Sequence, residues 1–189
     1  MTTQSITIVR HGETEWSKSG QHTGRTDIPL TPTGEAAARG LAARLAGGDY
    51  SAVWSSPSLR ARTTCDLAGY GANKVVKDDL AEWDYGDYEG VTTKKIQETR
   101  PGWELFRDGV PNGETAADVG ARADRIIAAL HAAEGDILIF SSSHFLRVLG
   151  ARWIGLPPEG GANFILDTAS VGILTEYHGQ PVIRRWNSV

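Results

Sequence analysis

The sequence predicts an α/β fold with three layers, in which helices cover both faces of a mostly parallel central sheet. Short apolar runs alternate along the chain with longer segments of helical period, which is typical of this fold class. Of the 189 residues, 40% are hydrophobic and 22% are charged, so the chain can bury a sizeable core. Because one domain commonly has roughly 150 residues, we expect residues 1–189 to form a single domain.

The expected strands are short apolar runs bounded by turn residues. In chain order they cover residues 6–9, 52–55, 75–77, 136–141, 171–177 and 182–186. Most of the segments between them have helical period, so we expect a helix in each of those connections.

The helix after the first strand begins at Thr31, an N-cap residue, with Pro32 at its first helical position. Apolar side chains recur every four residues behind it, which gives this helix one apolar face. Gly47 and Gly48 end the helix. The apolar face consists of Ala37, Leu41 and Leu45.

Three further helices have recognisable starting points. Ser56 followed by Pro57 predicts a helix start of the same kind. Thr115 with Asp118 three residues later resembles a capping box, and a fourth helix is expected near His144, directly after the fourth strand. The helix that begins after Thr115 has an apolar face formed by Val119, Ala123, Ile126, Ile127 and Leu130.

Residues 78–113 depart from this regular pattern. The segment is rich in Trp, Tyr, Gly and charged residues, with short helical pieces at 92–99 and 103–107. Long connections are uncommon in compact domains and are usually functional. We therefore expect this segment to form a lid or wall over one end of the sheet.

Composition excludes several classes of protein. A net charge of -4 lacks the basic excess of a surface that binds nucleic acid, and the single cysteine, Cys65, excludes an internal disulfide and a multi-cysteine metal cage. No apolar run approaches the roughly 20 residues that cross a bilayer, and residues 1–5 lack the pattern of a secretory signal. We expect a cytoplasmic protein with neither a nucleic-acid nor a membrane partner.

Basic side chains follow the carboxyl ends of three expected strands, where open α/β sheets bind their ligands. Arg10 and His11 follow the first strand, Arg60 lies in the helix after the second, and His144 and Arg147 follow the fourth. Guanidinium groups and the free N–H groups of a helix N-terminus match the oxygens of a phosphate group. The sequence therefore predicts a phosphate site at this edge of the sheet.

The run Arg-His-Gly-Glu-Thr at residues 10–14 resembles the signature of the histidine phosphatase superfamily, in the branch that contains cofactor-dependent phosphoglycerate mutases and small phosphatases. The resemblance spans nearly the whole chain and rests on six ordered segments. It implies a phosphoglycerate mutase-like fold, hydrolysis of a small phosphorylated metabolite, and no metal or organic cofactor. The other five segments are residues 21–31, 55–64, 81–90, 111–115 and 145–156.

The resemblance also implies roles for individual residues. His11 would attack phosphorus through a ring nitrogen and form a phosphohistidine. Arg10 and Arg60 would hold the phosphoryl oxygens and offset their charge. Glu82 would protonate the leaving alkoxide and then accept a proton from the attacking water. The implied substrate-binding residues are Glu13, Ser17, which stands where the family usually has an amide side chain, Thr23 and Gly24.

One position departs from the family's pattern. The second catalytic histidine of the family normally precedes a glycine, and these two places align with Ser142 and Ser143. The hydroxyl of Ser142 can contact substrate or a water but supplies no charge, and loss of such a donor costs about 100- to 1000-fold in rate. Three interpretations remain open. His144 turns inward as a catalytic group, the chain is a weakened relative that binds phosphorylated ligands, or it is an altered form of an active enzyme.

The leading hypothesis is thus a phosphoric monoester hydrolase that acts through His11. A phosphoglycerate mutase is the alternative, and it is disfavoured because the chain is shorter than the family's mutases and has less material to keep water out. No metal site is expected, since His11, His22 and His144 lack the helical spacing that zinc sites commonly use. Because dimers are the commonest assembly of such proteins, a homodimer is the oligomer to expect.

Overall fold

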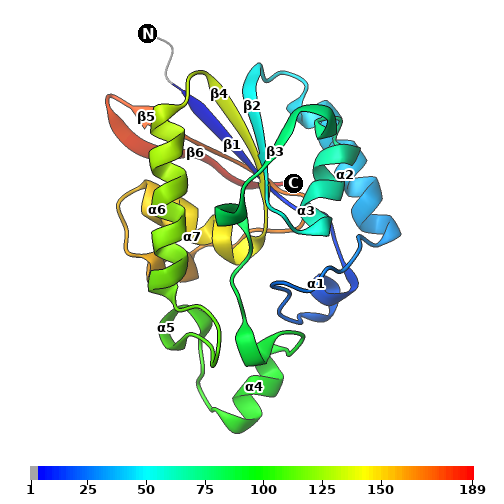
Figure 1. Ribbon diagram of the computed structural model, residues 1–189, viewed down its shortest axis with the longest axis vertical. Coiled ribbons are helices and arrows are strands. Elements are labelled where there is room, and N and C mark those ends of the chain that lie inside the picture. Colours follow the sequence, from blue (N-terminus) through cyan, green and yellow to red (C-terminus); the bar gives the residue numbers. More distant parts are fainter. Residues whose placement is uncertain (1–3) are drawn as a thin grey trace.

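A six-stranded sheet runs through the centre of the molecule, and helices cover both of its faces (Figure 1). The computed structural model describes residues 4–189, so residues 1–3 of the N-terminal stretch considered above lie outside the described residues. The strands are β1 (Ser5–Arg10), β2 (Tyr50–Ser55), β3 (Lys74–Val76), β4 (Asp136–Ser141), β5 (Val171–Tyr177) and β6 (Gln180–Ser188). The helices are α1 (Glu15–Ser19), α2 (Pro32–Leu45), α3 (Leu59–Leu67), α4 (Thr93–Thr99), α5 (Leu105–Asp108), α6 (Ala116–Ala132) and α7 (Ser143–Trp153).

The strand order is β3-β2-β4-β1-β5-β6. The first four strands in this order pair in parallel, whereas β5 pairs antiparallel with both β1 and β6. The connection between β5 and β6 is the two-residue turn His178-Gly179, in which both residues have positive φ angles of 52° and 75°. So short a turn joins only antiparallel strands. The α/β prediction is confirmed, and the sheet is mixed because of this terminal hairpin.

Successive side chains of the central strands point to opposite faces of the sheet, so the core has two parts, one on each face. Ile6 and Ile8 of β1 face a cluster that includes apolar side chains of α6 and α7. Val9, on the opposite face of the same strand, belongs to a cluster with Leu41 and Leu45 of α2. The three predicted layers are therefore α6 with α7, the sheet, and α2 with α3.

Most predicted helix starts are confirmed, and two predictions about the helices need correction: the start of α3 and the buried face of α2. Thr31 and Thr115 are the N-caps of α2 and α6 as expected. The second helix starts later than predicted, at Leu59 with Ser58 as its N-cap, because the N–H of Ser56 extends the sheet by donating to the carbonyl of Phe140 at 2.8 Å. Ala37 is exposed, and the buried face of α2 consists of Gly34, Ala38, Leu41 and Leu45.

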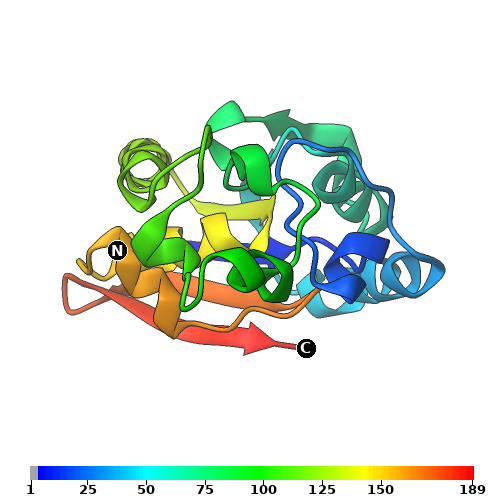
Figure 2. The ribbon, with the colours of Figure 1, turned by 90° about the horizontal axis from the view of Figure 1, so that it is seen from below.

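The carboxyl ends of the parallel strands meet at one end of the molecule, together with α1, α4 and α5 (Figure 1). Residues 78–113 include α4 and α5, and the view from below shows this segment lying over the end of the sheet (Figure 2). None of the helices in residues 4–189 combines the length and the apolar character that a membrane crossing requires.

Candidate active site

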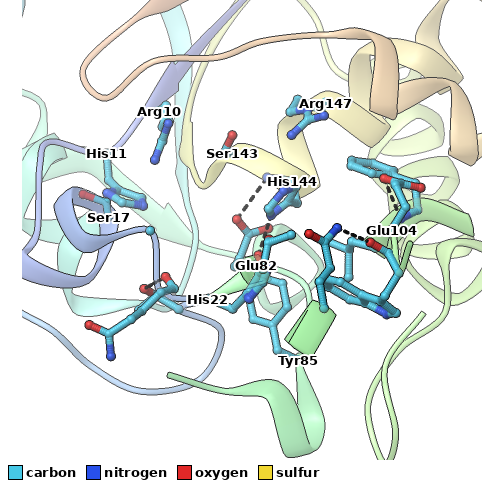
Figure 3. Close-up of a pocket in the computed structure, with 18 residues that line it drawn as sticks. Arg10, His11, Ser17, His22, Glu82, Tyr85, Glu104, Ser143, His144 and Arg147 are labelled. Atoms are coloured by element: carbon cyan, nitrogen blue, oxygen red, sulfur yellow. Dashed lines mark hydrogen bonds between the residues drawn. The ribbon is translucent and has the colours of Figure 1, made fainter. Parts of the chain in front are cut away.

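A cavity of about 390 Å³ opens at the carboxyl end of the sheet. Its walls come from the end of β1, the loop after α1, the 78–113 segment and the start of α7 (Figure 3). Polar and charged side chains make up much of the lining, including Arg10, His11, Glu82, His144 and Arg147. The topology thus brings together residues that are far apart in the sequence.

His11 follows β1 and is 4% exposed. Its Nδ1 lies 2.7 Å from the carbonyl oxygen of Gly12, which can only accept, so Nδ1 carries the proton and Nε2 keeps its lone pair. Burial lowers the pKa of His11 well below its usual range, and the nearby Arg60 and Arg10 lower it further. The ring is therefore neutral at pH 7, with Nε2 as its nucleophilic atom.

Close backbone contacts fix the position of His11. A Cβ atom on Gly12 would lie 2.5 Å from the carbonyl oxygen of Gly34, so only glycine permits the start of α2 to approach this closely. The N–H of Gly12 donates to Thr64 Oγ1 at 3.0 Å, and the N–H of His11 donates to the carbonyl of Ser141. The backbone of His11 and Gly12 is thereby tied to β4 and to the layer formed by α2 and α3.

Two guanidinium groups flank His11. Arg60 is fully buried on α3, and its Nε donates to His11 Nε2 at 3.3 Å. The Nη2 atom of Arg60 donates to the carbonyls of Thr23 and Gly24, which anchors the loop after α1. Arg10 lines the cavity next to His11, and its side chain also donates to the carbonyl of Leu166 (Figure 3). The predicted grouping of one imidazole with two arginines is present in the structure.

Glu82 lies at the cavity and is 7% exposed. Its Oε1 accepts from the N–H groups of Trp83 and Phe145 at 2.9 and 2.8 Å, and its Oε2 accepts from the N–H of His144 at 3.0 Å. Two of these donors belong to the first turn of α7, so the carboxylate caps that helix. This capping contact is not evident from the sequence, because the two partners are about sixty residues apart.

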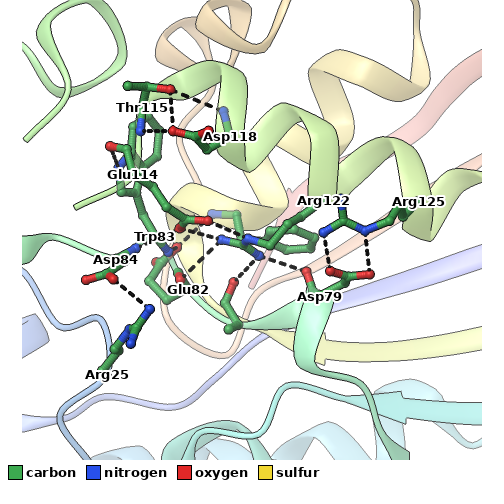
Figure 4. Close-up of polar contacts among 12 residues, drawn as sticks. Arg25, Asp79, Glu82, Trp83, Asp84, Glu114, Thr115, Asp118, Arg122 and Arg125 are labelled. Carbon is green, nitrogen blue, oxygen red and sulfur yellow. Dashed lines mark hydrogen bonds and ion pairs between the residues drawn. The ribbon is translucent and has the colours of Figure 1, made fainter. Parts of the chain in front are cut away.

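An arginine–glutamate ion pair supports the segment that carries Glu82 (Figure 4). Arg122 of α6 forms a bidentate ion pair with Glu114, with distances of 2.7 and 2.8 Å. Its Nη1 also donates to the carbonyls of Asp79 and Ala81 at 2.8 and 3.0 Å. The same glutamate accepts from the N–H of Asp84. These bonds fix the main chain on both sides of Glu82 to the long helix α6.

Ser142 and His144 differ in their relation to the cavity. Strand β4 ends at Ser141, and Ser142 is the N-cap of α7, so residues 142 and 144 do not continue along one face of a strand. The Ser142 side chain is fully buried, and its Oγ has no hydrogen-bond partner within residues 4–189. His144 lines the cavity, with its Nδ1 2.6 Å from the hydroxyl of Tyr85.

Of the four predicted substrate-binding residues before Arg60, two line the cavity and two are placed elsewhere. Ser17 and Thr23 belong to the lining. The Glu13 carboxylate instead accepts from the hydroxyl of Thr31 at 2.8 Å, and the N–H of Gly24 donates to the carboxylate of Glu89 at 2.9 and 3.0 Å. In this structure neither Glu13 nor the Gly24 amide is presented to a ligand in the cavity.

Two residues of the cavity lining, His22 and Arg147, have no individual catalytic or substrate-binding role predicted from the sequence. His22 has its Nδ1 2.6 Å from the carbonyl of Val91, and its ring lies 4.8 Å from that of Tyr85, centroid to centroid. Arg147 donates to the carbonyl of Gly161 at 2.9 Å and lies over the ring of Phe106. The place of Arg147 just beyond the fourth strand was a usable signal, whereas nothing in the local sequence of His22 reveals its orientation.

A buried neutral histidine with two arginines at the carboxyl edge of an α/β sheet defines an enzyme that acts on phosphate groups. Residues 6–189 match the family model of the histidine phosphatase superfamily (branch 1), and the chain belongs to this family. An acid phosphatase of Mycobacterium tuberculosis is 44% identical over 179 residues, which cover 92% of this chain and 87% of that protein.

Two further relatives agree with this assignment. A sedoheptulose 1,7-bisphosphatase of Saccharomyces cerevisiae is 43% identical over 182 residues, which cover 79% of this chain and 67% of the yeast protein. The solved structure of a Mycobacterium tuberculosis open reading frame product superimposes with a TM-score of 0.91 at 41% identity, covering 98% of each chain. The phosphoglycerate mutase-like fold is thereby confirmed, and the protein is a phosphoric monoester hydrolase.

Proposed function

We propose that the protein hydrolyses a small phosphorylated metabolite in two steps, with His11 as the nucleophile. The observation that supports this most directly is the hydrogen bond from His11 Nδ1 to the Gly12 carbonyl, which leaves the lone pair of the ring on Nε2, where it accepts from Arg60 Nε before a substrate binds. In the first step Nε2 forms a bond to phosphorus while the bond from phosphorus to the ester oxygen breaks. In the second step a water oxygen attacks phosphorus, and the bond to Nε2 breaks.

Arg10 and Arg60 stabilise the charge on the transferring phosphoryl group. Arg10 reaches the cavity directly. Arg60 does not belong to the cavity lining, and its Nε donates to His11 Nε2. When the substrate binds, this N–H donates to a phosphoryl oxygen in place of Nε2. Because both guanidinium groups are fixed by backbone carbonyls, little reorganisation accompanies the reaction.

Glu82 serves as the acid and base. As a carboxylic acid it donates a proton to the leaving alkoxide, and as a carboxylate it takes a proton from the attacking water. Its Oε2 accepts only one amide hydrogen bond, so this oxygen keeps a lone pair that can take up and release the proton. A bound phosphoryl group, which is negatively charged, favours that protonated form.

The departure at Ser142 lowers the expected rate of this reaction. His144 lines the cavity, but burial and Arg147 keep the pKa of its ring well below the usual range, so it is neutral and supplies no positive charge. The Ser142 hydroxyl is buried and does not belong to the cavity lining. His144 therefore does not supply the positive charge of the missing imidazole.

The cavity suits a substrate with a polar remainder beyond its phosphate. Arg147, Glu104 and Gln97 line the part of the cavity formed with the 78–113 segment, which acts as the specificity wall. The yeast relative is named for a sugar bisphosphate, and a phosphorylated sugar fits these side chains. A phosphoglycerate mutase is the alternative, and conversion of 3-phosphoglycerate to 2-phosphoglycerate with the bisphosphate primer would favour it.

Hydrolysis of p-nitrophenyl phosphate tests this function. The wild-type protein is expected to release p-nitrophenol, and His11→Asn to lose essentially all of this activity while it remains folded by circular dichroism. His131→Asn, on the exposed side of α6, is the matched control and should retain the wild-type rate. Equal rates for wild type and His11→Asn would refute the proposed role of His11.

A further inference from the structure

Two imidazole rings other than His11 lie in the cavity, and each is held by one hydrogen bond. His22, in the loop after α1, has its Nδ1 2.6 Å from the carbonyl oxygen of Val91. A carbonyl only accepts, so Nδ1 of His22 carries the proton. His22 lines the cavity, and its other ring nitrogen, Nε2, has no hydrogen-bond partner within residues 4–189, so Nε2 keeps a lone pair that can accept.

The second ring, His144, is held in the opposite tautomer. Its Nδ1 lies 2.6 Å from the hydroxyl of Tyr85, and the phenol makes no other hydrogen bond in the described part of the chain. Burial raises the pKa of Tyr85 well above its usual range, so the phenol keeps its proton. Because Nδ1 of His144 is the only hydrogen-bond partner of this buried O–H in the described part of the chain, the O–H donates to Nδ1. A neutral ring that accepts at Nδ1 carries its own proton at Nε2. His144 therefore presents a donor to the cavity.

The two rings are neighbours in the same wall (Figure 3). Their centroids are 6.2 Å apart, and the ring planes are inclined by only 29°. Tyr85 packs against both, with centroid distances of 4.8 Å to His22 and 5.9 Å to His144. Burial lowers the pKa of each imidazole, so both are neutral at pH 7. The wall thus offers one neutral acceptor beside one neutral donor.

We infer that His22 and His144 form a subsite for a hydroxyl group of the substrate's non-phosphate part. The hydroxyl donates its proton to His22 Nε2, and its oxygen accepts the Nε2 proton of His144. The inference rests on the proposed function and extends it, because it assigns the substrate to the phosphorylated polyols and sugars.

A hydroxyl fits this pair better than a carboxylate does. A hydroxyl is both donor and acceptor, so it satisfies both imidazole nitrogens, whereas a carboxylate oxygen only accepts and would face the lone pair of His22. The charged side chains in the lining are Arg10 and Arg147 on one hand and Glu82 and Glu104 on the other. With both rings neutral, this part of the wall adds no positive charge that would favour a second anion.

Nitrogen-15 NMR of the histidine side chains tests the tautomers without any need for turnover. His22 is expected to show its proton on Nδ1 and His144 on Nε2, and Tyr85→Phe should allow His144 to populate both forms. The same tautomer at both histidines, or an unchanged His144 in Tyr85→Phe, would overturn the inference.

Kinetics with matched substrates test the subsite itself. For sugar monophosphates and their singly deoxygenated analogues, the wild-type kcat/KM should fall about 10- to 100-fold for the analogue that lacks the bound hydroxyl, since two hydrogen bonds are lost. In His22→Phe that ratio should approach one. His22→Gln, which restores an acceptor of similar length, should recover part of it, and the exposed control His131→Phe should leave it unchanged.

The outcomes separate the two proposals. If the wild-type protein hydrolyses p-nitrophenyl phosphate but treats every deoxygenated analogue like its parent, or if His22→Phe keeps the discrimination, the hydroxyl subsite is wrong. If the wild-type protein hydrolyses neither sugar phosphates nor p-nitrophenyl phosphate, the proposed function fails, and the NMR tautomers decide the inference by themselves.

Discussion

Replacing Arg122 by Met tests whether the long helix α6 holds the Glu82 segment in place. The Arg122 side chain is 13% exposed, and its removal leaves Glu114 and the carbonyls of Asp79 and Ala81 without their donor. Breaking a buried ion pair costs 3–5 kcal/mol, and because this pair is partly solvated we expect about 3 kcal/mol. For a domain of this size that corresponds to a fall in Tm of about 6–12 °C.

The same substitution should also lower kcat. Arg122 does not line the cavity, and its Nη2 donates to the main-chain carbonyl of Glu82, so we expect its effect on the reaction to come from displacement of the Glu82 carboxylate. A displacement of about 1 Å can cost up to about 100-fold in rate, and we expect a loss of about 10- to 100-fold in kcat with little change in KM.

Arg125→Met is the matched control. Arg125 lies one turn further along α6 and also forms a bidentate ion pair with Asp79, but its side chain is 58% exposed. A solvent-exposed pair contributes at most about 1 kcal/mol. Thermal unfolding by calorimetry and p-nitrophenyl phosphate kinetics on both variants check these values. If the two variants lose equal stability, or if Arg122→Met keeps the wild-type kcat, the positioning role is refuted.

Three further predictions concern acid stability, thiol reactivity and the departure from the family's pattern. The buried rings of His11, His22 and His144 have lowered pKa values, so the unfolded chain binds more protons below about pH 6.5. The free energy of unfolding should therefore fall with falling pH, by up to about 1.4 kcal/mol per pH unit for each ring. Urea titrations at several pH values measure this free energy, and its decrease per pH unit should be smaller for His22→Phe than for the wild type. Burial raises the pKa of Cys65 to about 12, so its thiol should react with a disulfide reagent at pH 8 about a thousandfold more slowly in the folded protein than in denaturant; equal rates would contradict this burial. Ser142→His should raise kcat by about 100-fold, because neither Ser142 nor the neutral His144 supplies the missing charge, and an unchanged kcat would show that another group supplies it.

The elements of the fold follow closely from local sequence signals. The Thr115 and Asp118 capping box marks the start of α6, and the apolar run at 136–141 coincides with β4. The start of α3 was wrong by two residues because Ser56 makes a sheet hydrogen bond with Phe140, a residue more than eighty positions away. Local patterns do not encode contacts of that range.

The sequence predicts which charged residues gather at the candidate site, but it does not predict the hydrogen-bond partners of the site residues. Arg10, His11 and Arg60 stand at strand ends and helix starts, positions that a sheet topology brings together. The use of Glu82 as the cap of α7 and the pairing of Tyr85 with His144 depend on how the 78–113 segment lies across the sheet. Side-chain direction in an irregular segment is set by tertiary packing, so periodicity could not reveal it.

In the proposed reaction, Nε2 of His11 becomes covalently bonded to phosphorus during turnover. Rapid quenching of the enzyme with a phosphorylated substrate, followed by mass spectrometry of its peptides, measures this directly. We expect an acid-labile, base-stable phosphoryl group on His11, present in wild type and absent from His11→Asn. Continued hydrolysis with the label on another residue, or with no covalent phosphoenzyme in the quenched samples, would contradict it.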